Sequence, residues 1–287
     1  MKYQFITEQC SEFGVERMCR VLGVSKSGYY SYHKRYKSKR EQENELLLEQ
    51  IRKIHKKSRQ TYGSPRITDE LYDNHIRCSK NRVARLMRKN GIMAKMKRKF
   101  KVTTHSGHTD PVADNLLQQN FTTAGANKVW VSDITYIWTS EGWLYLSAIL
   151  DLFSRRIIGW GVSERLTSNL VTDALLKTIW QRKAEKGLLF HSDRGSQYAS
   201  SACRDTLKKH GLIQSMSGKG NCYDNAVMES FFHTLKTEMV YFEHFRTRSE
   251  AKQSIFDYIE VFYNRQRKHS AINYKSPADF ENMAMAA

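Results

Sequence analysis

The sequence predicts an α/β fold in which two helical segments precede a mixed five-stranded sheet with flanking helices. Two observations support this prediction. From Asn127 onward, three apolar runs of strand type follow one another, and helices and strands then alternate. Before residue 100, apolar residues recur at helical spacing, and Gly or Pro marks the turns. We therefore divide the chain into five segments: 1–40, 41–100, 101–126, 127–245 and 246–287.

The first segment is predicted to contain two helices joined by a short turn. Residues 5–20 have helical periodicity, which predicts one helix that ends near Leu22. Gly23 then supplies a turn, and Ser25 is a suitable N-cap for a second helix. This pattern is typical of a helix-turn-helix unit with Lys26 on its outer side, although an ordinary helical hairpin has the same spacing. The apolar positions of the first helix are Phe5, Ile6, Phe13, Val15, Met18 and Val21.

The second segment predicts a charged helix over 41–57 and then a second helical pair, Arg66–Asn74 and Lys80–Asn90. Ser79 is the expected N-cap of the last helix, and Gly91 is its expected C-cap. One face of that helix is basic, which suits contact with phosphates and a DNA groove; a solvated surface is the alternative. The basic residues of this face are Lys80, Arg82, Arg85, Arg88 and Lys89. A further basic run, of the kind that follows a phosphate backbone, contains Lys97, Arg98 and Lys99.

The charge of the chain is concentrated near its beginning. The formal net charge is +18; residues 1–100 carry 25 Lys and Arg against 10 Asp and Glu, whereas the remaining residues carry 22 against 19. A basic first third on a nearly neutral remainder predicts a polyanion-binding arm joined to a working domain. A lysine-rich soluble surface, or affinity for an anionic membrane, would explain the charge alone.

Cysteine usage and hydropathy predict the cellular setting. The five cysteines are widely spaced and never form a CxxC pair, which favours free thiols in a reducing cytosol. The sequence has no apolar run of roughly 18 residues and no signal-sequence pattern. We therefore expect a cytoplasmic protein that does not enter a membrane.

The second half of the chain has the element order of a ribonuclease-H-like fold. Three strands in a meander are followed by alternating helices and strands, which would build a mixed sheet with helices on its faces. The predicted strands are Val129–Trp138, Trp143–Leu150, Ile157–Val162, Leu188–Phe190 and Leu212–Met216. The predicted helices are Ser168–Lys186, Tyr198–His210 and Cys222–Val240, followed by a tail with a helix over Glu250–Tyr263 and a loop that contains Pro277.

Three carboxylates stand where such a fold can bring them together. Asp133 lies inside the first apolar strand, Asp193 directly follows the fourth, and Glu229 lies on the last helix, with 35 residues between Asp193 and Glu229. This arrangement can hold two divalent ions for phosphoryl transfer, which indicates the catalytic core of a polynucleotidyl transferase. Asp193 could instead be a turn residue and Glu229 a surface charge, but an acidic residue inside an apolar strand is costly unless paired or metal-bound. Asp151, which ends the second strand, competes with Asp133, or else caps a turn or pairs with a neighbouring arginine.

The last predicted helix carries a polar face beside its apolar stripe. The residues of this face are Asn225, Glu229, His233 and Lys236. Lys236 would hold a DNA phosphate next to the metal ions, or else is a solvated surface lysine. His191 and His233 lie near the carboxylates in sequence, and we interpret them, together with Asn225, as supporting residues rather than ligands.

Four motifs, taken in order, resemble the DDE transposases. Within that group they are most similar to the second reading frame (OrfB) of the IS-three insertion-sequence family, whose catalytic core is related to that of retroviral integrases. The motifs are Trp130–Ile137 (WVSDITYI), Asp151–Arg155 (DLFSR), His191–Tyr198 (HSDRGSQY) and Asp224–Phe232 (DNAVMESFF). The segments 14–30 and 62–91 and the tail around residues 263–265 are also similar, so the resemblance covers nearly the whole chain.

The resemblance implies a bacterial, DNA-associated transposase that nicks the ends of its element and joins the freed 3′-hydroxyl to target DNA. Position by position, Asp133, Asp193 and Glu229 match the ligands of two Mg²⁺ (or Mn²⁺) ions, and Lys236 matches the basic position after the Glu. The resemblance further implies a homo-oligomer on double-stranded DNA, and a partner or fusion product from an upstream reading frame. The leucine zipper of that upstream product and the retroviral His/Cys zinc module have no counterpart in this sequence.

Two other functions share part of this pattern. A nuclease of the same fold, without strand transfer, would have the three carboxylates but less need of two helical DNA-binding segments. A non-catalytic DNA-binding regulator would explain the charge and the N-terminal helices, but not three intact acidic positions.

Overall fold

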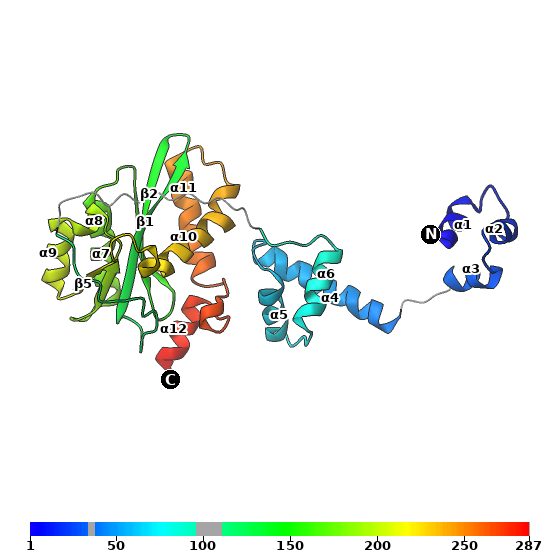
Figure 1. Ribbon diagram of the computed structural model, residues 1–287, viewed down its shortest axis with the longest axis horizontal. Coiled ribbons are helices and arrows are strands. Elements are labelled where there is room, and N and C mark those ends of the chain that lie inside the picture. The colour runs from blue at the N-terminus through cyan, green and yellow to red at the C-terminus, as the bar shows by residue number, and fades with distance from the viewer. Residues whose placement is uncertain (34–37, 96–110, 287) are drawn as a thin grey trace. The chain divides into compact units, whose positions relative to one another are not determined.

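Figure 1 shows the computed structural model, which describes residues 1–33, 38–95 and 111–286. These residues form two compact units, Met1–Lys53 and Ile54–Ala287. The predicted basic run with Lys97, Arg98 and Lys99 lies outside the described residues. Within those residues, none of the helices is both long and apolar enough to cross a membrane.

The first unit begins with three short helices, and the predicted single helix over 5–20 is wrong. The chain leaves helical geometry after Gln9, and Gly14 adopts an extended conformation before the second helix begins. As a result, Phe5, Phe13 and Val21 are exposed, although the periodic pattern had placed them with the buried residues. The helices are α1 (Lys2–Gln9), α2 (Val15–Val21) and α3 (Lys26–His33). Their small core consists of Ile6, Met18, Cys19 and Tyr29.

The predicted turn between α2 and α3 is confirmed. Gly23 has a φ of +62°, a conformation that glycine adopts without a Cβ penalty. The Ser25 hydroxyl then accepts a hydrogen bond from the Gly28 N–H at 3.0 Å, as expected for an N-cap. The α2–α3 pair therefore has the local construction of a helix-turn-helix.

The second group of helices matches its prediction closely. The Ser79 hydroxyl accepts from the Arg82 N–H at 3.2 Å, and Gly91 has a φ of +64° just after the last helix. The helices are α4 (Lys39–Lys57), which spans the boundary between the two units, α5 (Ser64–Asp73) and α6 (Lys80–Lys89). The buried residues of α6 are Val83, Leu86 and Met87.

The sheet of the second unit confirms the predicted fold class. Its strand order is β3-β2-β1-β4-β5, with β3, β2 and β1 antiparallel and with β4 and β5 parallel to β1. This is the mixed sheet of a ribonuclease-H-like fold. The strands are β1 (Val129–Thr139), β2 (Gly142–Asp151), β3 (Ile157–Ser163), β4 (Leu189–Ser192) and β5 (Ile213–Met216).

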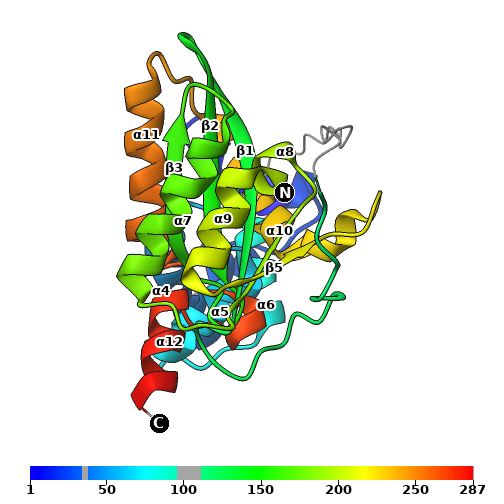
Figure 2. The ribbon, with the colours of Figure 1, turned by 90° about the vertical axis from the view of Figure 1, so that its left-hand side faces the viewer.

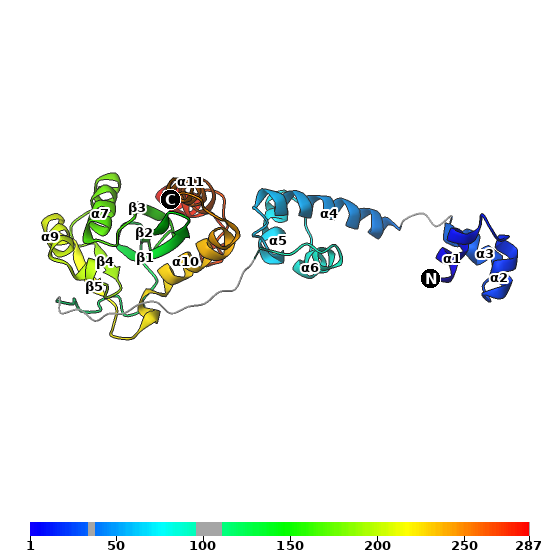
Figure 3. The ribbon, with the colours of Figure 1, turned by 90° about the horizontal axis from the view of Figure 1, so that it is seen from above.

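Helices cover both faces of this sheet, as Figures 1 and 3 show. One face packs against α7 and α9, and the other packs against α10 and the tail helix α11. Two apolar layers therefore hold β1 and β2 between helices, which explains why most of their residues are buried. The helices are α7 (Ser168–Arg182), α8 (Ser196–Ala199), α9 (Ser201–His210), α10 (Ala226–Glu238), α11 (Arg248–Phe256) and α12 (Pro277–Ala286).

Several predicted elements of the second unit differ from the structure. The helix over 168–186 ends at Arg182, because Lys183 has a φ of 50°, and the helix over 250–263 consists of α11 followed by a π-helix, Asp257–Tyr263. The helix over 198–210 is two helices, because Ser200 has a ψ of 149° and caps α9 by accepting from the Cys203 N–H. The helix over 222–240 begins with a 3₁₀ turn, Cys222–Asn225, and a second 3₁₀ turn, Val240–Phe242, follows it. The loop around Pro277 is helix α12, since proline suits the first turn of a helix.

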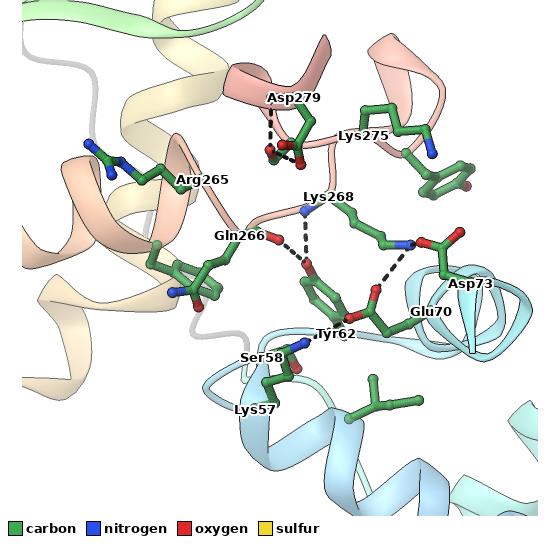
Figure 4. A pocket seen from close by; sticks show the side chains of 14 residues that line it. Lys57, Ser58, Tyr62, Glu70, Asp73, Arg265, Gln266, Lys268, Lys275 and Asp279 are labelled. Carbon is green, nitrogen blue, oxygen red and sulfur yellow. Dashed lines mark hydrogen bonds and ion pairs between the residues drawn. The ribbon is translucent and has the colours of Figure 1, made fainter. Parts of the chain in front are cut away.

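The tail contacts the helical segment that contains α5. The Tyr62 hydroxyl donates to the Gln266 carbonyl at 3.1 Å and accepts from the Lys268 N–H at 2.8 Å. The Lys268 ammonium contacts three carboxylates on α5, of which Glu70 lies at 3.0 Å. Figure 4 shows Glu70 and Asp73 beside Lys268. These carboxylates raise the pKa of Lys268 although burial opposes the charge. The other two carboxylates belong to Asp69 and Asp73.

Candidate active site

The first candidate carboxylate lies where β1 loses a neighbour. Asp133 pairs with Ala148 of β2, whereas the pairing of β1 with β4 ends one residue earlier, at Ser132 and Ser192. The Asp133 Oδ1 atom accepts a hydrogen bond from the Ile134 N–H at 2.7 Å. Asp133 is therefore held within β1, just past the point where the edge of β1 toward β4 becomes open.

The register of the sheet brings the second carboxylate to the same place. Asp193 follows Ser192 just as Asp133 follows Ser132, and these two serines pair across parallel strands. The Asp193 Oδ1 atom accepts from the Gly195 N–H at 2.9 Å, which fixes the turn that leads into α8. Two positions 60 residues apart thus become neighbours by strand register alone.

The third carboxylate comes from α10 on the other side of this edge. Asn225, which precedes the helix, donates from Nδ2 to the Ser132 carbonyl at 3.1 Å. This bond ties the start of α10 to the residue before Asp133. Glu229 lies one turn further along α10, and partial desolvation raises its pKa.

The other two carboxylates act electrostatically on Asp133. The pKa of Asp133 is raised well above its ordinary value, first because burial disfavours the charged form and then because Asp193 and Glu229 repel it. The Ile134 N–H and the Lys236 ammonium offset only part of this effect. The site therefore concentrates negative charge that its own cations do not balance.

This charge and the oxygen donors fit a hard divalent cation such as Mg²⁺ or Mn²⁺. Within residues 1–33, 38–95 and 111–286, no three side chains of His, Cys, Asp or Glu lie close enough together to hold a metal ion. The three carboxylates are thus electrostatic neighbours rather than a closed coordination shell.

Lys236 lies beside the carboxylates on the same helix as Glu229. Its Nζ atom is 5.0 Å from the centre of the Tyr136 ring, a cation–π distance. Burial lowers the pKa of Lys236, and Asp133 partly restores it. This lysine is therefore half-buried against β1.

The two histidines of the sequence prediction have different surroundings. His191 is fully buried: its Nδ1 lies 2.9 Å from the Ser215 hydroxyl and its Nε2 lies 3.3 Å from the Ser217 hydroxyl. Burial lowers its pKa to about 4, so it is neutral at physiological pH and links β4 to β5. His233 lies on α10 with an exposed side chain.

Asp151 lies at the other end of β1 and not with the three carboxylates. It pairs with Trp130 in the sheet and accepts hydrogen bonds from the N–H groups of Asn127 and Phe153. Its ionic neighbour is Arg182, at 3.8 Å, rather than one of the arginines that directly follow it in sequence. Asp151 therefore caps a turn.

Sequence reasoning missed Asp224, which is buried directly before Asn225. Its carboxylate accepts four hydrogen bonds, from the Gly218 N–H at 2.7 Å and from three side-chain amides. These amides belong to Asn115, Gln119 and Asn221. Asp224 thus joins residues of the segment before β1 to the loop before α10. An acidic residue at the start of a predicted helix was the available signal, but its partners are distant in sequence.

The predicted DNA-binding residues of α6 lie on the side opposite its buried residues. Lys80, Arg85, Arg88 and Lys89 are exposed and Arg82 is partly exposed. In the first unit, Lys26 is exposed and pairs with Glu16 at 3.2 Å. Each group is thus accessible to a polyanion.

Models of known protein families match most of the chain. An integrase core domain matches residues 123–222 and a second integrase core description matches 229–285, while an HTH-like domain matches 41–100. The transposase InsF for insertion sequence IS3A from Escherichia coli K12 is 44% identical over an alignment of 288 positions, which covers 100% of this chain and 100% of that protein. The insertion element IS600 uncharacterized 31 kDa protein of Shigella sonnei is 46% identical over 263 residues, covering 92% of this chain and 97% of that protein.

Among solved structures, the HTLV-2 integrase catalytic core domain in complex with magnesium aligns with 56% of this chain and 99% of that chain. The identity is 13% and the TM-score is 0.43.

Proposed function

The chain belongs to the family of IS3-type insertion-sequence transposases, and from that premise we propose that it cleaves the DNA ends of its element and transfers the freed 3′-hydroxyl to target DNA. The observation that supports this chemistry most strongly is the shared register of Asp133 and Asp193, with Glu229 beside them. Three carboxylates from separate parts of the chain within electrostatic reach are what a divalent-cation phosphoryl transferase requires.

Asp133, Asp193 and Glu229 would hold two Mg²⁺ or Mn²⁺ ions. Ions bound there supply Lewis-acid stabilisation of the phosphate and lower the pKa of an attacking hydroxyl. The chain itself positions the reacting groups. Asn225 fixes the first turn of α10 to β1, and Lys236 would hold a phosphate next to the carboxylates. His191 is neutral and buried, so it supports β4 and transfers no proton to substrate.

The helical segments would bind the DNA duplex. We propose that the exposed basic face of α6, which lies within the HTH-like match, acts as a recognition helix, and that Lys97, Arg98 and Lys99 add contacts to the phosphate backbone. Lys26 in the first unit would add a separate contact. Cutting and joining two ends requires two active sites, so we propose that the chain acts as a homo-oligomer on DNA, with a product of an upstream reading frame as a further partner.

A nuclease without strand transfer, or a regulator without catalysis, would share parts of this structure. Strand transfer to a second duplex separates the transposase from the nuclease, and nicking that depends on Mg²⁺ separates both from the regulator. The location of Asp133 within a buried strand and beside Asp193 favours the catalytic functions, since a carboxylate there is costly unless it is paired or binds a metal ion.

The test compares wild type, Glu229→Gln and Glu243→Gln on a labelled duplex, with and without Mg²⁺. Glu243 is an exposed residue after α10, so its variant is a matched control for charge. We expect Glu229→Gln to lower nicking and strand transfer by at least about a hundredfold while DNA affinity is retained. Equal activity in wild type and Glu229→Gln would remove Glu229 from the site.

A further inference from the structure

The hairpin formed by β1 and β2 extends beyond the rest of the sheet. The two strands pair as far as Thr139 and Gly142, whereas β4 leaves β1 after Ser132 and β3 pairs with β2 only from Tyr145 onward. Figure 2 shows the hairpin projecting past α7, α8 and α9. We call its distal part, residues 136–145, the ribbon.

The ribbon carries a continuous group of aromatic rings. Trp138 faces Trp143 across the two strands with ring centres 4.8 Å apart, and the Tyr136 ring lies 5.0 Å from that of Trp143. Trp138 is 60% exposed and Trp143 is 43% exposed. A group of large aromatic side chains that are this exposed indicates a binding surface and not part of a core.

The ribbon is held in place, so its rings form a rigid platform. The Ser140 N–H donates to the Phe245 carbonyl at 3.0 Å. Arg248 donates from its backbone N–H to Glu141 at 2.8 Å and from Nε to the Trp143 carbonyl at 3.2 Å. The turn and the second strand are therefore fixed to the segment before α11, and little entropy is lost when a ligand stacks on the rings.

Lys236 links the ribbon to the carboxylates. Tyr136 is three residues beyond Asp133 on β1, and Lys236 contacts the ring of Tyr136 while interacting with Asp133. The Lys236 ammonium can contact a phosphate of a DNA strand while the neighbouring aromatic rings contact its bases. At about 3.4 Å per residue, Trp138 lies about 17 Å along the strand from Asp133.

From these contacts we infer that the ribbon is a stacking site for unpaired nucleobases of the DNA strand next to the cleaved phosphate, with Trp138 as its principal contact. The inference rests on the proposed function, because it takes the carboxylates to be the place of cleavage. Rings stack only on exposed base faces, which the interior of a duplex does not offer, so the ligand is a frayed or single-stranded segment. Stacking accepts every base, and the ribbon would therefore bind without sequence preference.

The test measures binding of two fluorescent DNA molecules in EDTA: a blunt duplex, and the same duplex with a five-nucleotide single-stranded extension that carries 2-aminopurine. The variants are Trp138→Ala, Trp138→Phe and Trp180→Ala. Trp180 is a matched control, since it is 73% exposed on α7. We expect Trp138→Ala to weaken binding of the extended DNA by about 5- to 150-fold and to reduce 2-aminopurine quenching. Trp138→Phe should retain most of the affinity, and binding of the blunt duplex should not change.

Three results would overturn the inference. Trp138→Ala could bind both DNA molecules with the same affinity as Trp180→Ala. It could also lose the same amount of affinity for the blunt duplex as for the extended DNA. In sedimentation without DNA, Trp138→Ala could also change the oligomeric state, which would assign the ribbon to a protein contact. Because EDTA prevents metal-dependent cleavage, these outcomes are independent of whether Glu229→Gln abolishes strand transfer.

Discussion

The buried His191 makes a quantitative prediction about acid stability. Its pKa in the folded chain is about 4 because burial disfavours the charged ring, whereas an unfolded histidine has its ordinary value of 6.5. Between these values the unfolded chain binds a proton that the folded chain does not. Stability therefore falls as the pH decreases through this window, and the full difference, 6.5 − 4, corresponds to about 3 kcal/mol at roughly 1.4 kcal/mol per pH unit.

His191→Asn removes this titration while an amide can still reach the Ser215 hydroxyl. At pH 7 the variant should be less stable by about 1–2 kcal/mol, because the contact to Ser217 and some packing are lost. Near pH 4 it should be the more stable protein, since only the wild type has lost about 3 kcal/mol from His191. The two curves of stability against pH should therefore cross.

Urea unfolding followed by tryptophan fluorescence suits this measurement, because all five tryptophans lie between Trp130 and Trp180 and report the catalytic core. His269, whose pKa is also lowered to about 4, contributes equally to both proteins and cancels in the difference. His244→Asn, at an exposed position, is the control and should follow the wild-type slope. If wild type and His191→Asn lose stability in parallel from pH 7 to pH 4, then His191 is not a buried neutral histidine.

Two further substitutions test the packing of the second unit. Lys268→Met leaves three carboxylates of α5 without their shared cation. The free energy of unfolding should fall by about 1–3 kcal/mol, and residues 54–95 should become more sensitive to limited proteolysis. The control Lys209→Met, at an exposed site, should change neither the stability nor the proteolysis. Gly159→Ala would place its Cβ 1.7 Å from Oγ1 of Thr178, so urea unfolding should show a loss of about 1–3 kcal/mol. Gly125→Ala meets no heavy atom within 4 Å and should be neutral.

Structural features that depend on a few neighbouring residues could be predicted from the sequence. The caps at Ser25 and Ser79, and the succession of strands and helices that defines the fold, depend on composition within a few positions. The break at Ser200 was missed because serine is acceptable inside a helix and also as an N-cap, and only tertiary packing chooses between them.

Contacts between distant residues could not be predicted in the same way. Asp224 accepts from amides at positions 115 and 119, and nothing in either stretch indicates the other. Lys268 and the acidic residues of α5 are separated by about two hundred residues in the same manner. The carboxylates of the candidate site could be selected from the sequence because of their places in or after apolar strands and on a helix, and because their motifs resemble the DDE transposases. The register that places Asp133 beside Asp193 is known only from the structure.

Hydrogen bonds hold helix α10 at both ends, and they therefore hold Glu229 in position. Asn225 ties its start to β1, while Glu238 near its end receives two hydrogen bonds from Arg267, at 2.7 and 2.8 Å. The residue after Arg267 donates its N–H to Tyr62, which belongs to the helical segment with the HTH-like match. Buried polar contacts therefore connect that segment with the helix that carries Glu229.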